Sequence, residues 1–229
     1  MKVFALSFML SLVGAGMFSQ NVAGVNPRQI GSGMFLRNYF TTPFESKEKY
    51  SGIEGSPYID ESWTLARLYV DSVQFFDSIK IRINAYENRV HFLDESNEEF
   101  QATGLFQRIL IIDKDSKWFG VIFRSGLYEQ PNIYFQVMTD GPKAQLLQKI
   151  KIEKWVTKAV FEESKTIFQP EKELFFATHN NLIKQNKDCA YLKELTAGNK
   201  VMLQFIKDNM LKCNKEADMK RIVQFINAQ

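Results

Sequence analysis

The chain has 229 residues, 45% of them hydrophobic and 14% aromatic, a composition that excludes extended disorder. The formal net charge is only +3, but residues 1–141 hold 13 basic and 16 acidic residues, whereas residues 142–229 hold 16 basic and 10 acidic. A basic half of this kind can meet anionic lipid headgroups or acidic polysaccharide, or it can be a solvated lysine-rich surface. Because no nucleic-acid-binding motif is present, we expect no nucleic-acid partner.

Residues 1–20 have the pattern of a secretory signal peptide. Lys2 gives a positive start, residues 4–13 form an apolar run, and residues 14–16 are small. The alternative is a membrane anchor, but spanning a bilayer takes about 20 apolar residues. The first cysteine is Cys189, so no cysteine follows the leader as a lipoprotein would require. We therefore expect a periplasmic or extracellular protein with no transmembrane segment after cleavage.

Residues 21–60 are expected to form an irregular lead-in. Gly31-Ser32-Gly33 and Thr41-Thr42-Pro43 interrupt any regular element. Several side chains are nevertheless too apolar for a free tail, so the lead-in should pack on the domain that follows. These are Phe35, Leu36, Tyr39, Phe40 and Phe44.

Residues 61–186 alternate apolar and polar side chains, as half-buried β-strands do. The clearest strand should bury Ile79, Ile81, Ile83 and Ala85 and expose Lys80, Arg82 and Asn84. Asp140-Gly141 is a strong hairpin turn signal. Besides residues 63–69, we expect strands at residues 90–92, 98–103, 108–112, 117–124, 133–138, 144–151, 173–178 and 182–185, with residues 156–161 as an extension.

Residues 187–229 change to a helical period, with Asp188 as a plausible N-cap. One helix face should carry Met202, Phe205, Ile206 and Met210, and a second should carry Met219, Ile222, Val223 and Ile226. Short amphipathic helices are marginal alone and must dock on the sheet. The sequence thus predicts an α+β fold: a largely antiparallel meander of eight or nine strands, curled or sandwiched, with C-terminal helices packed on it.

Cys189 and Cys213 are the two cysteines of the chain. In an oxidising compartment they are candidates for a disulfide that joins two C-terminal helices. The alternative is a pair of buried free thiols, which behave as small hydrophobes. A catalytic thiol is a weaker interpretation, because no Cys-x-x-Cys spacing occurs.

Reaction chemistry has few candidates in this sequence. His91 is expected to face outward from a strand and His179 to lie in a turn, and neither has the spacing of a metal ligand. The acidic group Asp94, Glu95, Glu98 and Glu99 can be a cation site or a solvated hairpin tip. No nucleophile elbow, phosphate-binding loop or zinc-protease motif is present. We therefore assign no catalytic, metal or cofactor-binding residue and expect no cofactor.

The strand aromatics allow two interpretations. They can form an ordinary core, or they can line a pocket for an acyl chain if the sheet curls into a half-open barrel. The residues concerned are Phe75, Phe76, Phe92, Phe119, Phe123, Tyr134 and Phe135.

Some motifs resemble a group of uncharacterised exported proteins of Bacteroidota. They include Gly55-Ser56-Pro57-Tyr58 before Trp63, residues 81–88, Tyr134-Phe135-Gln136-Val137 before Gly141, and residues 205–209. The resemblance implies an exported envelope protein of a Gram-negative cell and carries over no functional residue.

The sequence favours an exported, non-enzymatic envelope protein that binds or scaffolds an envelope protein or another partner. A periplasmic carrier of a lipid or other hydrophobic ligand is the first alternative, and it requires an apolar cavity of several hundred Å³. An envelope glycan hydrolase is the second, and it requires two carboxylates that face one another across a cleft.

Overall fold

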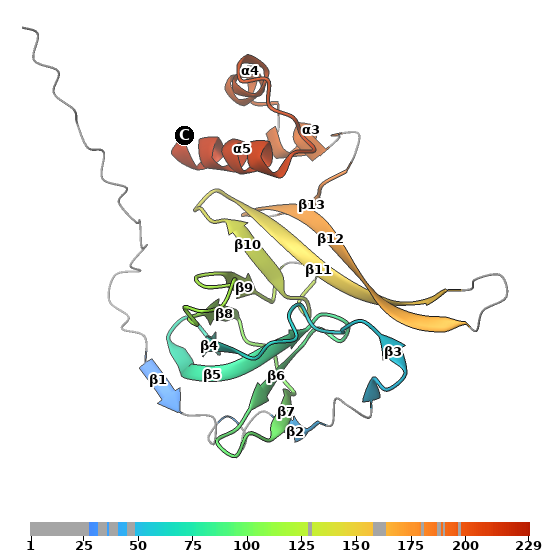
Figure 1. Ribbon diagram of the computed structural model, residues 1–229. Helices are drawn as coiled ribbons and strands as arrows, with labels where there is room; N and C mark the ends of the chain where they lie inside the picture. Colours follow the sequence, from blue (N-terminus) through green and yellow to red (C-terminus); the bar gives the residue numbers. More distant parts are fainter. Residues whose placement is uncertain are drawn as a thin grey trace, which may run out of the picture.

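Two antiparallel meanders join edge to edge in one open, mixed sheet of thirteen strands, with helices near the C-terminal end (Figure 1). The computed structural model describes residues 28–31, 36, 41–44, 49–127, 130–157, 164–179, 181–186, 189, 191–196 and 198–229. The proposed leader, residues 1–20, lies outside these ranges. The fold is α+β and mostly β, as the sequence predicts.

The first meander runs through β4 (Thr64–Tyr69), β5 (Gln74–Asn84), β6 (Arg89–Leu93) and β7 (Glu99–Ala102). The chain then returns so that β8 (Arg108–Ile111) pairs with β4. From there the second meander continues through β9 (Ile122–Arg124), β10 (Phe135–Thr139), β11 (Ala144–Thr157), β12 (Lys165–Thr178) and β13 (Leu182–Lys184). The β4–β8 pair thus replaces the simple meander that we expected.

The lead-in corrects both the predicted strand number and the predicted strand direction. It contributes β1 (Arg28–Gly31), β2 (Thr41–Pro43) and β3 (Ile53–Glu54) to the sheet. β1 pairs in parallel with β5, and β3 pairs in parallel with β12, so the sheet is not wholly antiparallel. These strands have only two to four residues and little periodicity of their own. Partners distant in sequence, rather than local pattern, order them.

The lead-in does pack on the domain, as its apolar residues predict. Leu36 is fully buried in the main core, and the Phe44 ring lies against the ring of His91. Phe35, Tyr39 and Phe40 fall outside the described residues. Because the lead-in covers part of the sheet, it also changes the environment of β5. Ile79, Ile81 and Ile83 are buried as expected, but Asn84, expected on a wet face, is also fully buried.

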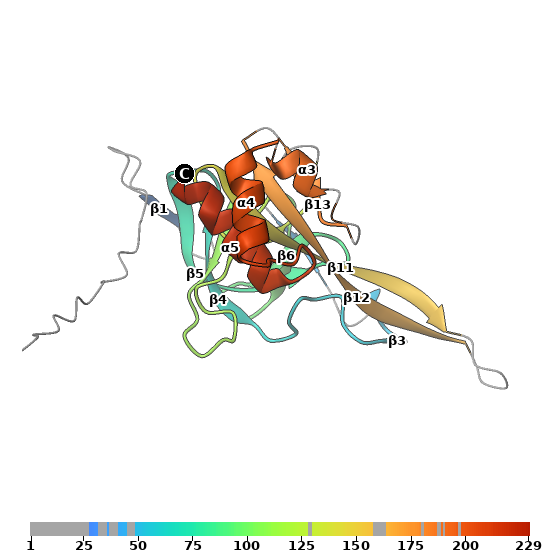
Figure 2. The same ribbon diagram turned by 90° about the horizontal axis from the view of Figure 1, so that it is seen from above.

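The main core lies between the strands of the first meander and β8–β9, and its largest fully buried side chains include Phe76, Phe92 and Ile109. A second cluster, around Leu146, Phe176 and Met219, joins the β11–β12 hairpin to the helices. The far half of that hairpin extends away from the first meander (Figure 2), pairs with β3 and exposes Trp155 and Val156.

Three helices form a cap on the sheet: α3 (Tyr191–Thr196), α4 (Lys200–Asp208) and α5 (Glu216–Ala228). Asn199 begins α4 by accepting hydrogen bonds from the amides of Val201 and Met202. The expected faces are largely correct, and Met202, Met219, Ile222 and Val223 are buried. Met210 is the exception: it follows the end of α4 and is 84% exposed. Asp188 lies outside the described residues.

One side chain fixes the end of α5 to the sheet. The Asn227 side-chain oxygen accepts from the amides of Lys143 and Ala144, at 2.9 and 3.0 Å, and its amide group donates to the Ala144 carbonyl at 2.9 Å. Asn227→Ala should lower the free energy of unfolding by about 2 kcal/mol, because three hydrogen bonds are lost. Gly141→Ala should act through the same contact, because an added Cβ would overlap the Asn227 side chain.

Urea denaturation of each single variant and of the double variant tests this link. The two losses should be less than additive, since both remove one interaction. Gln224→Ala, at an exposed position of the same helix, is the control and should change stability by less than about 0.5 kcal/mol. Additive losses would contradict a shared contact.

Candidate functional site

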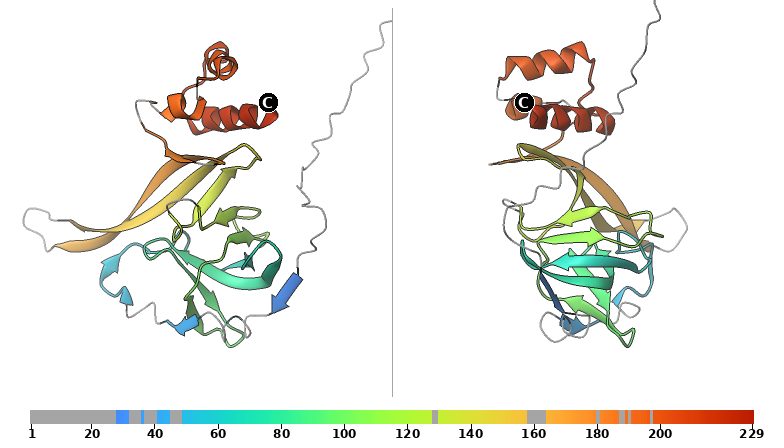
Figure 3. Two further views of the ribbon diagram at one scale, coloured as in Figure 1. Left: turned by 180° about the vertical axis from the view of Figure 1, so that it is seen from behind. Right: turned by 90° about the vertical axis from the view of Figure 1, so that its left-hand side faces the viewer.

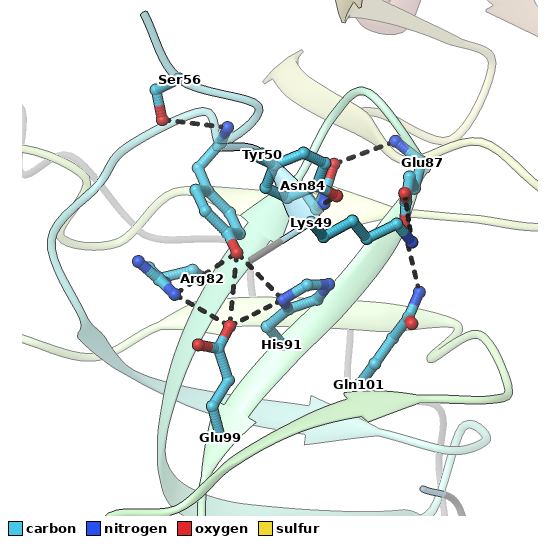
Figure 4. Close-up of polar contacts among 10 residues, drawn as sticks. Lys49, Tyr50, Ser56, Arg82, Asn84, Glu87, His91, Glu99 and Gln101 are labelled. Atoms are coloured by element: carbon cyan, nitrogen blue, oxygen red, sulfur yellow. Dashed lines mark hydrogen bonds and ion pairs between the residues drawn. The ribbon is translucent and has the colours of Figure 1, made fainter. Parts of the chain in front are cut away.

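Three neighbouring strands present polar side chains on the face of the sheet opposite the main core. Arg82 of β5 lies opposite His91 of β6, and Glu99 of β7 is paired with Leu93, two residues beyond His91. Because strand side chains alternate, Arg82, His91 and Glu99 share one face while Ile81, Phe92 and Phe100 point into the core. Figure 4 shows the three polar side chains converging.

The Glu99 carboxylate is the centre of this group. Its Oε1 accepts from Arg82 at 2.8 Å, from His91 Nδ1 at 2.9 Å and from the Tyr58 hydroxyl at 3.3 Å. Arg82 also donates to the Tyr58 hydroxyl at 3.3 Å. Tyr58 comes from the lead-in, so these bonds connect it to three strands of the sheet. We call Tyr58, Arg82, His91 and Glu99 the Glu99 network.

Arg82 is held from several directions at once. Its guanidinium carbon lies 4.0 Å from the centre of the Tyr58 ring and 4.1 Å from that of Trp63. Only 14% of the Arg82 side chain is exposed, and its Nε has no hydrogen-bond partner among the described residues. Its orientation is therefore fixed before any ligand arrives.

His91 is fully buried, which corrects the prediction that it faces outward. The lead-in covers this face of β6, and the Phe44 ring centre lies 4.2 Å from that of His91. A carboxylate can only accept, so Nδ1 carries the proton that bonds Glu99. Nε2 is buried without a hydrogen-bond partner in the described part of the chain. A general base needs one imidazole nitrogen directed at a reactant, and His91 presents none to solvent.

A second polar group continues the layer toward Tyr50. Asn84 donates to the Tyr50 hydroxyl at 2.7 Å and accepts from the Glu87 amide at 3.0 Å, and Lys49 pairs with Glu87 at 2.7 Å (Figure 4). Burial raises the pKa of the Tyr50 hydroxyl, although the Asn84 bond opposes the change. Burial alone would also raise the pKa of Glu87, but Lys49 and Tyr50 hold it below its usual value.

An open groove of about 330 Å³ borders these two groups. Its lining is polar and aromatic: Tyr50, Gly55, Ser56, Pro57, Tyr58, Glu61 and Arg82. The loop at residues 55–58 forms one wall. Gly55 has a φ of +82°, and an added Cβ would lie 3.1 Å from the Phe168 carbonyl oxygen, so this close approach to β12 requires glycine. We call this feature the Arg82 groove.

The other candidate residues from the sequence either lie away from the groove or make contacts that stabilise the fold. Asp94 accepts from the amides of Ser96 and Glu98 and closes the β6–β7 turn, which also contains Glu95. Glu99 alone of that acidic group joins the network, and His179 is exposed in a bend. Within the described ranges, no group of three or more His, Cys, Asp or Glu side chains is arranged to hold a metal ion.

Most of the strand aromatics belong to the core. Phe75, Phe76, Phe92, Phe123, Tyr134 and Phe135 are buried, whereas Phe119 is 55% exposed. Ile81, Ile111, Trp118 and their neighbours line an apolar pocket of about 20 Å³, far below the usual range of about 300–1,000 Å³ for ligand sites.

Cys189 and Cys213 lie at disulfide-bonding distance, with their Cα atoms 5.7 Å apart, as the disulfide prediction requires. Tyr191 strengthens the same connection, because its hydroxyl donates to the Cys213 carbonyl at 2.7 Å. The pair lies in the cap and not at the Arg82 groove.

Asp60 joins the loop beside the groove to the turn between β8 and β9. It accepts from Lys117 at 2.7 Å, the Trp118 indole at 3.0 Å and the Ser62 amide at 2.9 Å. Burial alone would raise the pKa of Asp60, but these three donors lower it to about 2. The stabilisation is therefore present above pH ~4 and is lost as the pH falls toward 2. Because Lys117 is largely exposed, we expect the ionised Asp60 carboxylate to contribute only about 1 kcal/mol to the free energy of unfolding.

Asp60→Asn should therefore destabilise the protein by about 1 kcal/mol at pH 7 and reduce the loss of stability between pH 4 and pH 2. Urea denaturation across this pH range measures both effects. Glu61→Gln, at the next and exposed position, serves as the control. Parallel stability curves for Asp60→Asn and the unsubstituted protein would contradict the expectation.

Comparisons with protein families, curated proteins and solved structures found no match for this chain. Among the described residues, the helices are too short or too polar to cross a membrane. The proposal for function therefore depends on the geometry of the Arg82 groove. This site is not evident from the sequence, because Arg82, His91 and Glu99 are separated in the chain. Their alternation with buried residues was the available signal.

Proposed function

We propose that this chain is an exported, non-enzymatic binding protein of the cell envelope, and that its ligand occupies the Arg82 groove. The charged and apolar leader pattern of residues 1–20 supports export, and the adjacent cysteines of the cap suit an oxidising compartment. The observation that carries the binding proposal is the fixed position of Arg82 on the wall of the groove.

A ligand that meets Arg82 gains from this fixed geometry. Tyr58, Trp63 and Glu99 hold the guanidinium in place, so little side-chain entropy is lost when it donates to a ligand. Glu61 supplies an acceptor on the same groove, and Glu99 balances the charge of Arg82. These groups suit a small polar ligand that carries both hydrogen-bond acceptors and donors.

The same geometry favours binding over catalysis. The two hydrogen bonds of the His91 ring are both made through Nδ1, and Nε2 is buried. The Glu99 carboxylate already accepts from three donors on one oxygen. These bonds attach the lead-in to the sheet and orient Arg82, so we interpret His91 and Glu99 as supports for a binding residue.

Native mass spectrometry of the protein purified from its own periplasm tests this function. We expect a small molecule to accompany the unsubstituted protein and to be lost from Arg82→Lys, which keeps the charge but removes the planar donor fork. Arg67→Lys is the matched control. Arg67 also pairs with a carboxylate, Asp77, and stacks on a ring, Phe75, but does not line the groove.

Both variants must show a cooperative thermal unfolding transition, which establishes that they are folded. Retention of the bound molecule by Arg67→Lys and its loss from Arg82→Lys support the proposal. If the protein carries no bound molecule, or if Arg82→Lys retains it fully, the groove is not the binding site and the proposal fails.

A further inference from the structure

The helix α4 forms the outermost layer of the molecule. It lies on α5, and α5 in turn packs against β10 and β11 (Figures 1 and 3). Met202 is buried on the inner face of α4, and the Phe205 ring stacks on Phe225 of α5 at 3.9 Å. The inner apolar face is thus satisfied within the cap, and the outer surface of α4 faces away from the sheet.

Large apolar side chains are exposed to solvent on α4 and in the turn that follows it. Leu203 and Met210 are 45% and 84% exposed, and Val201, which is 61% exposed, lies about 160° around the helix from Leu203. They account for three of the six exposed large hydrophobic residues in the described part of the chain, and they lie within ten positions of one another. Met210 has a φ of +49°, in the turn that directly follows α4. Leu203 and Met210 thus expose apolar surface on α4 and in the turn directly after it, as interaction surfaces do.

Exposed lysines lie on α4 and in the segment that follows it. Lys200, Lys207, Lys212 and Lys215 are all exposed, and none forms an ion pair with a described residue. Lys200, Leu203 and Lys207 are spaced by three and four residues, so they lie along one stripe of the helix. The acidic residue of α4, Asp208, lies about 140° around the helix from Leu203 and outside this stripe.

We propose that this α4 surface binds the surface of an anionic lipid bilayer. Leu203 and Met210 would enter the boundary between headgroups and acyl chains, and the lysines would meet phosphate-bearing headgroups. A protein partner fits less well, because the centres of protein interfaces are depleted in lysine, whereas basic and apolar side chains side by side are typical of membrane-surface helices. This proposal does not depend on the Arg82 groove.

Co-sedimentation of the purified protein with lipid vesicles tests the proposal. We expect binding to phosphatidylcholine vesicles that contain one-third phosphatidylglycerol, and at least about tenfold weaker binding to pure phosphatidylcholine. Leu203→Glu with Met210→Glu should weaken binding to the anionic vesicles by about tenfold or more. Neutralising Lys200 and Lys207 as Lys200→Gln and Lys207→Gln should weaken it by about fivefold per lysine, and added salt should reduce the difference.

Phe119→Glu is the matched control, because Phe119 is similarly exposed but lies in the β8–β9 connection. All these substitutions are at exposed positions, so far-ultraviolet circular dichroism should match that of the unsubstituted protein. The proposal is overturned if anionic vesicles bind no more protein than neutral ones. It is equally overturned if the Leu203/Met210 double variant binds as well as Phe119→Glu, in which case the cap is not the membrane surface.

Discussion

Replacing Glu99 with glutamine is expected to lower the free energy of unfolding by about 3 kcal/mol, among the largest effects of any substitution in the Glu99 network. The Glu99 side chain is only 15% exposed and accepts from Arg82, His91 and Tyr58. Removal of its charge leaves the Arg82 guanidinium buried beside a neutral amide. The oxygen of the glutamine amide can still accept some of these bonds, so Glu99→Ala should cost more.

Urea denaturation at pH 7 measures this loss, with Glu98→Gln, at the exposed neighbouring position, as the control. Replacing the pair together, as Arg82→Met with Glu99→Leu, should recover part of the stability, because no unpaired charge remains buried. A Glu99→Gln variant as stable as Glu98→Gln would show that the network does not hold the lead-in on the sheet.

Loss of the Cys189–Cys213 connection is expected to lower the free energy of unfolding by a similar amount. The two residues are 24 positions apart, and closing a loop of that length restricts the unfolded chain by about 3 kcal/mol in the chain-entropy description. The double substitution Cys189→Ala with Cys213→Ala should lower stability by this amount and increase hydrogen exchange in α3. The Tyr191 ring, stacked on Phe176 at 4.7 Å, should keep part of the cap docked.

Intact mass before and after reduction provides the direct measurement. A bonded pair gains two hydrogens on reduction, and the reduced protein should unfold at a lower urea concentration than the oxidised one. Reduction of the double variant is the control and should change nothing. A protein isolated from its own compartment that gains no mass on reduction would establish two free thiols instead.

Together these two links explain how a long open sheet remains one folded unit. The Glu99 network fixes the lead-in to the first meander, Asn227 fixes the cap to the second, and the cysteine pair joins two segments of the cap. The proposed ligand site lies at the first link and the proposed membrane surface lies on the cap.

Elements with a local burial pattern follow from the amino-acid order alone. The period of two predicted the buried residues Ile79, Ile81 and Ile83, and the helical period predicted α4 and α5, because each burial pattern repeats within a few residues. Cys189 and Cys213 were identifiable as a candidate pair because they are the two cysteines of the chain.

Which strand faces are covered, and which distant side chains come together, depends instead on long-range packing. His91 and Asn84 were expected in water, but the lead-in, whose short strands have no pattern of their own, covers them. The Arg82 groove depends on that same cover, since Tyr58 and the loop at residues 55–58 approach β5 from outside the sheet. Alternation assigns a side chain to one face of a strand, but whether that face is wet depends on contacts between residues far apart in the chain.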